Sequence, residues 1–363
     1  MRILLVTTSY PASDDDPSGH FVRAEARELA RAGHEVHVVA PLAGRPVEQD
    51  KRVPSLALHR VGGAELFGWP GAVARIKTNP LHFVHAPRFV LHARRRIASL
   101  GAVDRVLGHW IVPAGFPVLF DPPAPLELVA HGADVRLLCA MPNPVRHAVI
   151  SMLLDRRTNF RFVARASFQT LVEKLSPQLR ERLVHASRIE PAAFELPDIT
   201  QRAAEIRALM SEHERGFVVA VGRLIELKRF HLAIDAAAGA RVPLVVIGDG
   251  PLRGELERRA RERDARITFK GLLSRTETLA WIAASRVLVH PSRAEAAPTV
   301  VREARALGVS VVATPSGDLS MWAQKDPGIV LVEAHAEALG ATIAAMIARQ
   351  TTAAEKSVRT ELF

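Results

Sequence analysis

The chain has 363 residues, 48% of them apolar and 24% charged, with a mean hydropathy of +0.09. This composition excludes a disordered, collagen-like or disulfide-stapled chain, and a typical domain length of roughly 100–200 residues predicts two domains. The single Cys139 suits a reducing cytoplasm, and no apolar run is long enough for a signal peptide or a membrane span.

Much of the net charge of +10 falls in one segment. Residues 51–100 hold nine basic residues and one acidic residue. Such an excess fits a solvated face of an arginine-rich chain, and it also fits a patch for anionic lipid headgroups, an anionic acceptor or nucleic acid. Because the sequence has no nucleic-acid-binding motif and only 5% aromatic residues, we expect no nucleic-acid partner.

The first half alternates short β-rich runs with helical stretches, a pattern that predicts βαβ units and a parallel sheet. The expected strands are residues 2–7, 35–40, 104–108, 126–130 and 161–164. The expected helices are residues 21–32, one or two within 71–100, and a last one at 168–183. Residues 189–200 contain Pro191 and Pro197 and predict a linker.

A second alternating series follows the linker. Its expected strands are residues 217–221, 244–247, 267–269, 287–289, 309–313 and 329–332. Its expected helices are residues 230–239, 252–263, 275–284, 299–307 and 337–348. Each half is therefore predicted to be a doubly wound α/β domain, and ligands of such domains bind beyond the carboxyl ends of the strands. Two such rims facing one another would form an interdomain cleft.

Two pairs of charged residues follow strands of the second half. Arg223 and Lys228 lie five residues apart in a turn behind Gly222, where two cations can neutralise a pyrophosphate, although most such pairs are only solvated. Glu295 and Glu303 flank Pro298, which is expected to begin a helix, so both carboxylates can reach one ligand at the helix start. Pairing of Glu303 with a neighbouring arginine is the alternative.

Histidines follow two strands of the first half. His131 and Asp134 have no G-x-S-x-G motif to complete a Ser–His–Asp triad. The remaining roles for His131 are a hydrogen bond to a ligand or a structural contact in a turn. His109 is similar, and Trp110 beside it favours packing. The sequence has no zinc-ligand spacing, no Walker loop and no G-x-G-x-x-G, which counts against ATP and NAD as ligands.

In order and spacing, these motifs resemble the retaining glycosyltransferases of family 4, which have the GT-B fold of two Rossmann-like domains. The motifs of the second half are Val221-Gly222-Arg223-Leu224 with Lys228, Gly248-Asp249-Gly250-Pro251, and Pro291-Ser292-x-x-Glu295 through Glu303-Ala304. Those of the first half are Ser9-Tyr10-Pro11, Gly19-His20-Phe21-Val22, Gly33-His34-Glu35-Val36, His109-Trp110 and His131-Gly132-Ala133-Asp134-Val135.

The resemblance implies an acceptor domain at residues 1–190, a nucleotide-sugar domain at 191–345, and a helix in 346–363 that packs back toward the first domain. It implies catalytic roles for four residues, namely Arg223, Lys228, Glu295 and His131. The implied donor-binding residues are Gly19, Gly222, Gly271, Leu272, Leu273, Ala296, Ala297, Pro298, Thr299 and Glu303, and the implied acceptor-side residues are His109, Trp110 and Asp134. No metal or other cofactor is expected.

The sequence departs from the family near the expected site, at Arg229 and Ala296 among other positions. The family often has Lys-Gly where this chain has Lys228-Arg229, and a glycine where it has Ala296. A side chain at position 296 restricts the backbone that would face the sugar and phosphate, which can alter donor choice or lower activity.

The resulting hypothesis is a metal-independent, retaining hexosyltransferase that uses a UDP- or GDP-sugar and a glycan or lipid-linked acceptor, as in bacterial polysaccharide assembly. We expect it in the cytoplasm, with peripheral contact to an anionic membrane through residues 51–100. The alternatives are a catalytically silent nucleotide-sugar-binding subunit, a sugar-nucleotide epimerase of the same fold, and a basic membrane-surface scaffold.

Overall fold

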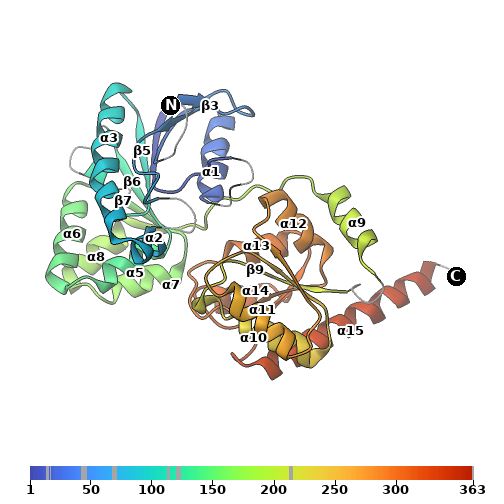
Figure 1. The fold of residues 1–363 in the computed structure, drawn as a ribbon. Helices are drawn as coiled ribbons and strands as arrows, with labels where there is room; N and C mark the ends of the chain where they lie inside the picture. Colours follow the sequence, from blue (N-terminus) through green and yellow to red (C-terminus); the bar gives the residue numbers. More distant parts are fainter. Residues whose placement is uncertain are drawn as a thin grey trace. The chain divides into compact units, whose positions relative to one another are not determined.

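The chain divides into two compact units, Met1–Glu195 and Leu196–Phe363 (Figure 1). The predicted boundary between residues 190 and 191 falls in the stretch 190–199, which has neither helix nor strand. The computed structural model describes residues 1–13, 16, 18–41, 47–67, 72–112, 115–119, 124–211 and 216–361. Gly71, the expected start of a helical segment, and positions 68–71 of the basic segment 51–100 lie outside these ranges.

The first unit contains an eight-stranded sheet in the order β3-β4-β2-β1-β5-β6-β7-β8, parallel except where β3 pairs with β4. The strands are β1 (Arg2–Thr7), β2 (Glu35–Ala40), β3 (Val47–Gln49), β4 (Leu56–Arg60), β5 (Arg105–His109), β6 (Leu126–Ala130), β7 (Asn159–Phe162) and β8 (Ser187–Ile189). The chain crosses from one side of β1 to the other between β4 and β5. The carboxyl ends of β1 and β5 therefore form a topological switch point, where such sheets bind ligands.

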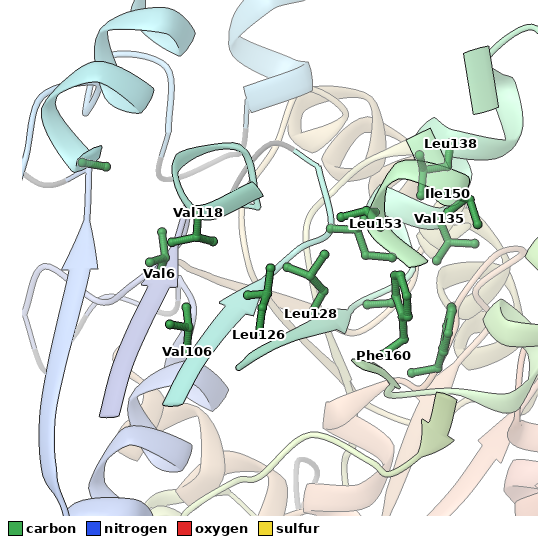
Figure 2. Close-up of a cluster of buried hydrophobic side chains, with 14 of the residues drawn as sticks. Val6, Val106, Val118, Leu126, Leu128, Val135, Leu138, Ile150, Leu153 and Phe160 are labelled. Carbon is green, nitrogen blue, oxygen red and sulfur yellow. The ribbon is translucent and has the colours of Figure 1, made fainter. Parts of the chain in front are cut away.

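Helices cover both faces of this sheet because successive residues of its central strands alternate between two apolar cores. Leu4 and Val6 of β1 join the larger core, part of which Figure 2 shows, whereas Ile3 and Leu5 pack toward α1 (His20–Arg31). The larger core is covered by α3 (His85–Ser99), α4 (Phe116–Leu119), α5 (Ala133–Ala140), α6 (Asn143–Asp155), α7 (Arg165–Val172) and α8 (Pro177–His185). Between β4 and α3 lie α2 (Ala72–Thr78) and the 3-10 helix η1 (Pro80–Val84).

The second unit contains a six-stranded, fully parallel sheet in the order β11-β10-β9-β12-β13-β14. All six predicted strands are present, as β9 (Val218–Val221), β10 (Leu244–Ile247), β11 (Ile267–Gly271), β12 (Val287–His290), β13 (Ser310–Ala313) and β14 (Ile329–Leu331). The chain crosses over β9 between β11 and β12, so the switch point of this unit lies at the carboxyl ends of β9 and β12.

Two layers of helices enclose the second sheet. One face is covered by α9 (Thr200–Leu209), α12 (Arg275–Ala284), α13 (Thr299–Ala306) and α14 (Leu319–Lys325). The other face is covered by α10 (Phe230–Ala240), α11 (Arg253–Glu262) and α15 (Ala336–Glu361). The 3-10 helix η2 (Glu226–Lys228) follows β9. Among the helices of the described ranges, none combines the length and apolar character needed to cross a bilayer.

Three predictions about elements need correction. The expected helix at 168–183 is two helices, α7 and α8, because Pro177 cannot continue a helix and instead begins a new one after Ser176. The expected separate helix in 346–363 is part of the single helix α15, whose last described residue is Glu361; positions 362–363 lie outside the described ranges. The linker region 189–200 ends where the unpredicted α9 begins, at Thr200.

Candidate active site

The loops at the switch point of the second unit bring together two of the predicted catalytic residues. Arg223 lies in the loop after β9, and Lys228 ends η2 in the same loop. Lys228 forms an ion pair with Glu295, which lies in the loop after β12. Residues separated by 67 positions in the sequence thus meet at one rim, as expected for the carboxyl ends of neighbouring parallel strands.

Glu295 is held in a charged, partly enclosed environment. Its Oε1 also accepts a hydrogen bond from Ser292 Oγ at 2.9 Å, and His290 Nε2 lies 3.7 Å away. Burial acts to raise the pKa of Glu295, but Lys228 and His290 outweigh it and the pKa is lowered. Burial, and then the charge of Lys228, lowers the pKa of His290 to about 4. At neutral pH the site therefore contains a carboxylate and a neutral imidazole beside Lys228.

The loop after β13 packs against the backbone of Glu295 and Ala296. Gly317 has a φ of 52°, and a Cβ atom there would lie 2.2 Å from the carbonyl oxygen of Ala296, so only glycine fits. Asp318 N donates to the same carbonyl at 3.0 Å. The loop after β13 thus holds the backbone at Glu295 and Ala296 in place. Ala296 and Ala297 are partly exposed.

The helix α13 carries the second predicted carboxylate. Thr299 is the first helical residue, as the predicted range 299–307 has it, and Pro298 precedes it as the N-cap. Glu303 is 6% exposed and forms an ion pair with Arg275 of α12. Glu303 also interacts electrostatically with its sequence neighbour Arg302, so the alternative pairing is present beside the contact with Arg275.

The end of β11 completes the rim. Gly271 closes the strand and accepts a hydrogen bond from Gly248 N at 2.8 Å, which ties the turn after β10 to β11. Leu272 is 47% exposed, whereas Leu273 packs against the apolar core. The structure therefore places Gly271 and Leu272, two of the expected donor-binding residues, on the same rim as Gly222, which follows β9.

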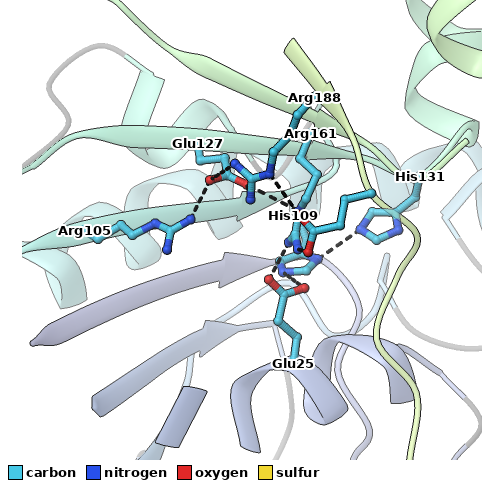
Figure 3. Close-up of polar contacts among 8 residues, drawn as sticks. Glu25, Arg105, His109, Glu127, His131, Arg161 and Arg188 are labelled. Atoms are coloured by element: carbon cyan, nitrogen blue, oxygen red, sulfur yellow. Dashed lines mark hydrogen bonds and ion pairs between the residues drawn. The ribbon is translucent and has the colours of Figure 1, made fainter. Parts of the chain in front are cut away.

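In the first unit, His131 and His109 lie at the carboxyl ends of β6 and β5 and share a hydrogen bond (Figure 3). Nδ1 of His109 is 2.9 Å from Nε2 of His131, and the two rings stack. His109 is fully buried, and its Nε2 lies 3.7 Å from the carboxylate of Glu25 on α1. Glu25 is in turn paired with Arg161 of β7.

This arrangement selects one tautomer for the two neutral rings. Burial, with added effects of nearby charges, lowers the pKa of His131 to about 3 and that of His109 well below its ordinary value. If His109 donated from Nδ1, the lone pair on its Nε2 would face the carboxylate of Glu25. Donation from Nε2 of His131 avoids this conflict. His131 then carries its lone pair on Nδ1, where it can accept a hydrogen bond.

The remaining predicted residues of the first unit have mixed environments. Asp134 is 2% exposed, and its carboxylate accepts hydrogen bonds from four backbone amides, those of Ile111, His131, Gly132 and Val135. Its contacts fix the loop that carries His131. The ring of Trp110 is partly exposed and lies 4.5 Å from that of His131, so it is the predicted acceptor-side residue best placed to meet a ligand.

Gly19 is the N-cap of α1 and has a φ of 62°. A Cβ atom at this position would lie 2.2 Å from the carbonyl oxygen of Ser9, so the close approach of these two backbone segments requires glycine. The unpaired amides of a helix start attract anions. The geometry is therefore compatible with contact between this helix start and an anionic group, as the expected donor-binding role of Gly19 requires.

Sequence reasoning missed several residues that build these sites. Glu25 and Arg161 act on His131 through His109, and Arg275 holds Glu303. Their partners lie at least 28 positions away in the sequence, and no local pattern reveals such contacts. His290 ends β12 next to the recognised motif that begins at Pro291, and its position at the end of a strand is the one signal that could have identified it. Within the described ranges, no group of three or more His, Cys, Asp or Glu side chains is placed to hold a metal ion.

A family model of known proteins matches most of the second unit. Residues 201–360 match the family model described as glycosyl transferases group 1. TuaC of Bacillus subtilis, named as a glycosyltransferase of teichuronic acid biosynthesis, is 25% identical over 94% of this chain and 88% of its own length. The O-antigen chain mannosyltransferase C of Escherichia coli is 29% identical over 121 residues, which cover 32% of this chain and 32% of that enzyme.

A solved structure of low sequence identity shares the fold. Anabaena HepE, solved in complex with UDP, superposes with a TM-score of 0.64 at 16% identity over 96% of this chain and 91% of its own. Likeness at this identity shows the fold alone. The arrangement is the GT-B fold, with Rossmann-like α/β units, as the sequence predicts.

Proposed function

We propose, from the premise that residues 201–360 form a glycosyl transferase domain of group 1, that this chain is a retaining, metal-independent hexosyltransferase of family 4. It moves a sugar from a UDP- or GDP-sugar to a hydroxyl of a glycan or a lipid-linked acceptor. The overall reaction breaks the bond between the sugar C1 and the diphosphate, and forms a bond from C1 to the acceptor oxygen as that hydroxyl loses its proton. The relatives named for cell-surface polysaccharides favour glycoconjugate assembly as its setting.

The observation that carries this proposal is the contact of Lys228 with Glu295 at the switch point of β9 and β12. A cation there can stabilise the negative charge that develops on the departing diphosphate, and Arg223 in the same loop adds a second charge. Glu295, fixed by Ser292, would accept hydrogen bonds from hydroxyls of the transferred sugar. These charges act where charge develops, so no metal ion is needed in the proposed reaction.

Other residues of the second unit would bind the rest of the donor. A carboxylate has about four lone-pair sites, so Glu303 can accept from a ribose diol while it remains paired with Arg275. The base would lie against the backbone at Gly271 and Leu272. In the first unit, His131 would meet the acceptor or the sugar through Nδ1, beside the ring of Trp110.

A transfer assay tests the proposal and separates it from its alternatives. Each of a UDP-, GDP-, ADP- and dTDP-sugar is incubated with the chain and an acceptor, and the anomeric configuration of the product is read by NMR. We expect transfer with retention and loss of turnover in Glu295→Ala. Donor binding without any turnover would indicate a silent subunit, conversion of the donor without an acceptor would indicate an epimerase, and an inverted product would contradict retention.

We also propose that the chain docks peripherally on the cytoplasmic face of an anionic membrane through the segment 51–100. Leu81, Phe83 and Val84 of η1 are 73%, 64% and 60% exposed, which is unusual for large apolar side chains. Arg94 and Arg95 on α3 are also exposed. Apolar residues that insert at the headgroup boundary, next to arginines that attract anionic lipids, are typical of interfacial binding.

Vesicle co-sedimentation tests this surface. We expect binding to vesicles that contain anionic lipid, weakened by salt, and at least tenfold weaker in Phe83→Ser. Leu209→Ser is the matched control, because Leu209 is 77% exposed and lies outside this segment. Equal binding of neutral and anionic vesicles, or equal loss in both variants, would contradict the proposal.

A further inference from the structure

Arg229 has a backbone conformation that residues other than glycine seldom adopt. It joins η2 to α10 with a φ of 49° and a ψ of 42°, in the left-handed region. Glycine adopts this conformation without steric cost, whereas an arginine is strained in it. Strain of this kind persists only when surrounding contacts compensate for it, and it is concentrated at functional sites. The contacts of the Arg229 side chain therefore require an explanation.

The guanidinium group connects three loops of the second unit. From the loop after β9, Nε donates to the carbonyl oxygen of Pro291 at 2.6 Å, in the loop after β12. Nη2 donates to Oγ1 of Thr314 at 2.8 Å, in the loop after β13. The planar guanidinium presents several donors in a rigid fork, which suits one side chain bonding two loops at once.

These hydrogen bonds continue to the candidate catalytic carboxylate. Thr314 is fully buried, and its Oγ1 donates to the carbonyl oxygen of Ser292 at 3.0 Å. Ser292 Oγ then donates to Oε1 of Glu295 at 2.9 Å. The backbone supports the same link, because Arg293 N donates to the carbonyl oxygen of Leu227 at 2.8 Å. Arg229 thus acts on Glu295 through buried partners, while Lys228, its neighbour in sequence, contacts Glu295 directly.

We propose that Arg229 is a positioning residue of the donor site, which holds the loop carrying Glu295 in register with Lys228 and with the loop after β13. The kinetic consequence rests on the proposed function. The hydrogen bonds by which Arg229 holds the loops together lie within the second unit and do not depend on that function. Release of the brace lets the carboxylate and the ammonium group drift from the geometry that the donor requires. A displacement of about 1 Å at such a site can lower the rate on the order of a hundredfold.

The test compares Arg229→Gly with Arg241→Gly. Arg241 ends the same helix α10, has a φ of 55° and is exposed, so both variants replace a left-handed arginine by glycine. Hydrogen exchange is followed at the amides of Arg293, Thr314 and Asp318, each of which makes a hydrogen bond within these loops. We expect these amides to exchange at least tenfold faster in Arg229→Gly than in the unaltered chain. In Arg241→Gly we expect their exchange rates to stay unchanged. Unchanged exchange in Arg229→Gly overturns the proposal.

Kinetics supply the functional measurement. We expect kcat/KM for the nucleotide sugar to fall about tenfold to a hundredfold in Arg229→Gly, to recover partly in Arg229→Lys, and to stay unchanged in Arg241→Gly. Thr314→Val keeps the shape of the side chain but removes its hydroxyl. A double-mutant cycle of Arg229→Gly with Thr314→Val should be non-additive, because the two changes break the same hydrogen bond.

The two proposals fail in different ways. Additive losses in the cycle, or full activity in Arg229→Gly, overturn the positioning role. If the unaltered chain neither binds nor transfers any nucleotide sugar, the proposed function fails, and the exchange experiment still decides whether Arg229 braces the loops.

Discussion

Arg161 offers a test of how the first unit is held together around its histidines. The side chain is 7% exposed and lies among three carboxylates (Figure 3). It is paired with Glu25, lies 3.3 Å from Glu127 Oε1, and lies 3.6 Å from Glu190 Oε1. The variant Arg161→Met retains the apolar part of the side chain but loses the positive charge. The buried carboxylates are then left without this charged partner.

The expected cost follows from the burial of the carboxylates that remain. Glu25 is 8% exposed and depends on Arg161, whereas Glu127 also has Arg105 and Arg188 as partners. Removal of one partner from a buried pair costs about 3–5 kcal/mol. Because Glu127 retains partners, we expect about 3 kcal/mol for Arg161→Met, at the lower end of this range.

Urea unfolding at pH 7 measures this cost against a surface control. Arg182→Met removes an ion pair with Asp155 whose side chains are 43% and 61% exposed, and it should cost much less, because exposed ion pairs contribute little to stability. Adding Glu25→Gln to Arg161→Met should restore part of the loss, because the stranded charge is gone. The difference between Arg161→Met and the unaltered chain should also shrink as the pH falls, since burial raises the pKa of Glu25. Equal costs for both arginines would refute this account of the buried network.

Two further predictions concern pH and glycine. Burial is the main cause that lowers the pKa of His59 and His290 to about 4 and that of His131 to about 3, so the unfolded chain binds protons near pH 6.5 that the folded chain does not. The free energy of unfolding should therefore fall as the pH drops from about 6.5 to 4, by about 1.4 kcal/mol per histidine per pH unit. In urea titrations, His59→Asn should reduce the slope of this free energy against pH. An unaltered slope would exclude His59 as a cause. In thermal unfolding, Gly317→Ala should lower the free energy of unfolding by on the order of 2 kcal/mol or more, because its Cβ would clash with a carbonyl oxygen. Gly239→Ala is the control; it lies in open space on α10 and should raise that free energy by about 0.5–1 kcal/mol. An unchanged stability in Gly317→Ala would contradict the close approach.

The sequence predicts the parallel strands of the second sheet because each is a short, nearly continuous apolar run bounded by turns. The edge strands of the first unit give weaker signals. All three residues of β3 are exposed and it has a single antiparallel neighbour, so its sequence lacks the apolar run of a central strand. The break at Ser176-Pro177 was visible in the sequence as an N-cap followed by proline, and it outweighs the apolar spacing on either side.

The candidate site shows the same division between local and distant information. Lys228 and Glu295 each follow a predicted strand, and sheet topology alone indicates that they share a rim. The pairing of His109 with Glu25 depends on how α1 packs across the sheet, which no local pattern encodes. In the sequence Arg229 stands out only as a departure from the family pattern, whereas its contacts indicate that it supports the loops there.

Calorimetric titration of nucleotide sugars tests the central claim most directly, namely that Lys228 lies where the diphosphate of the donor binds. The control is Lys325→Met, which alters an exposed lysine at the end of α14. Loss of a hydrogen bond to a charged group corresponds to about a tenfold to hundredfold change in affinity. We therefore predict that one nucleotide sugar binds the unaltered chain and Lys325→Met equally, and binds Lys228→Met at least tenfold more weakly. Equal affinity for Lys228→Met, or no binding of any UDP-, GDP-, ADP- or dTDP-sugar, would contradict the claim.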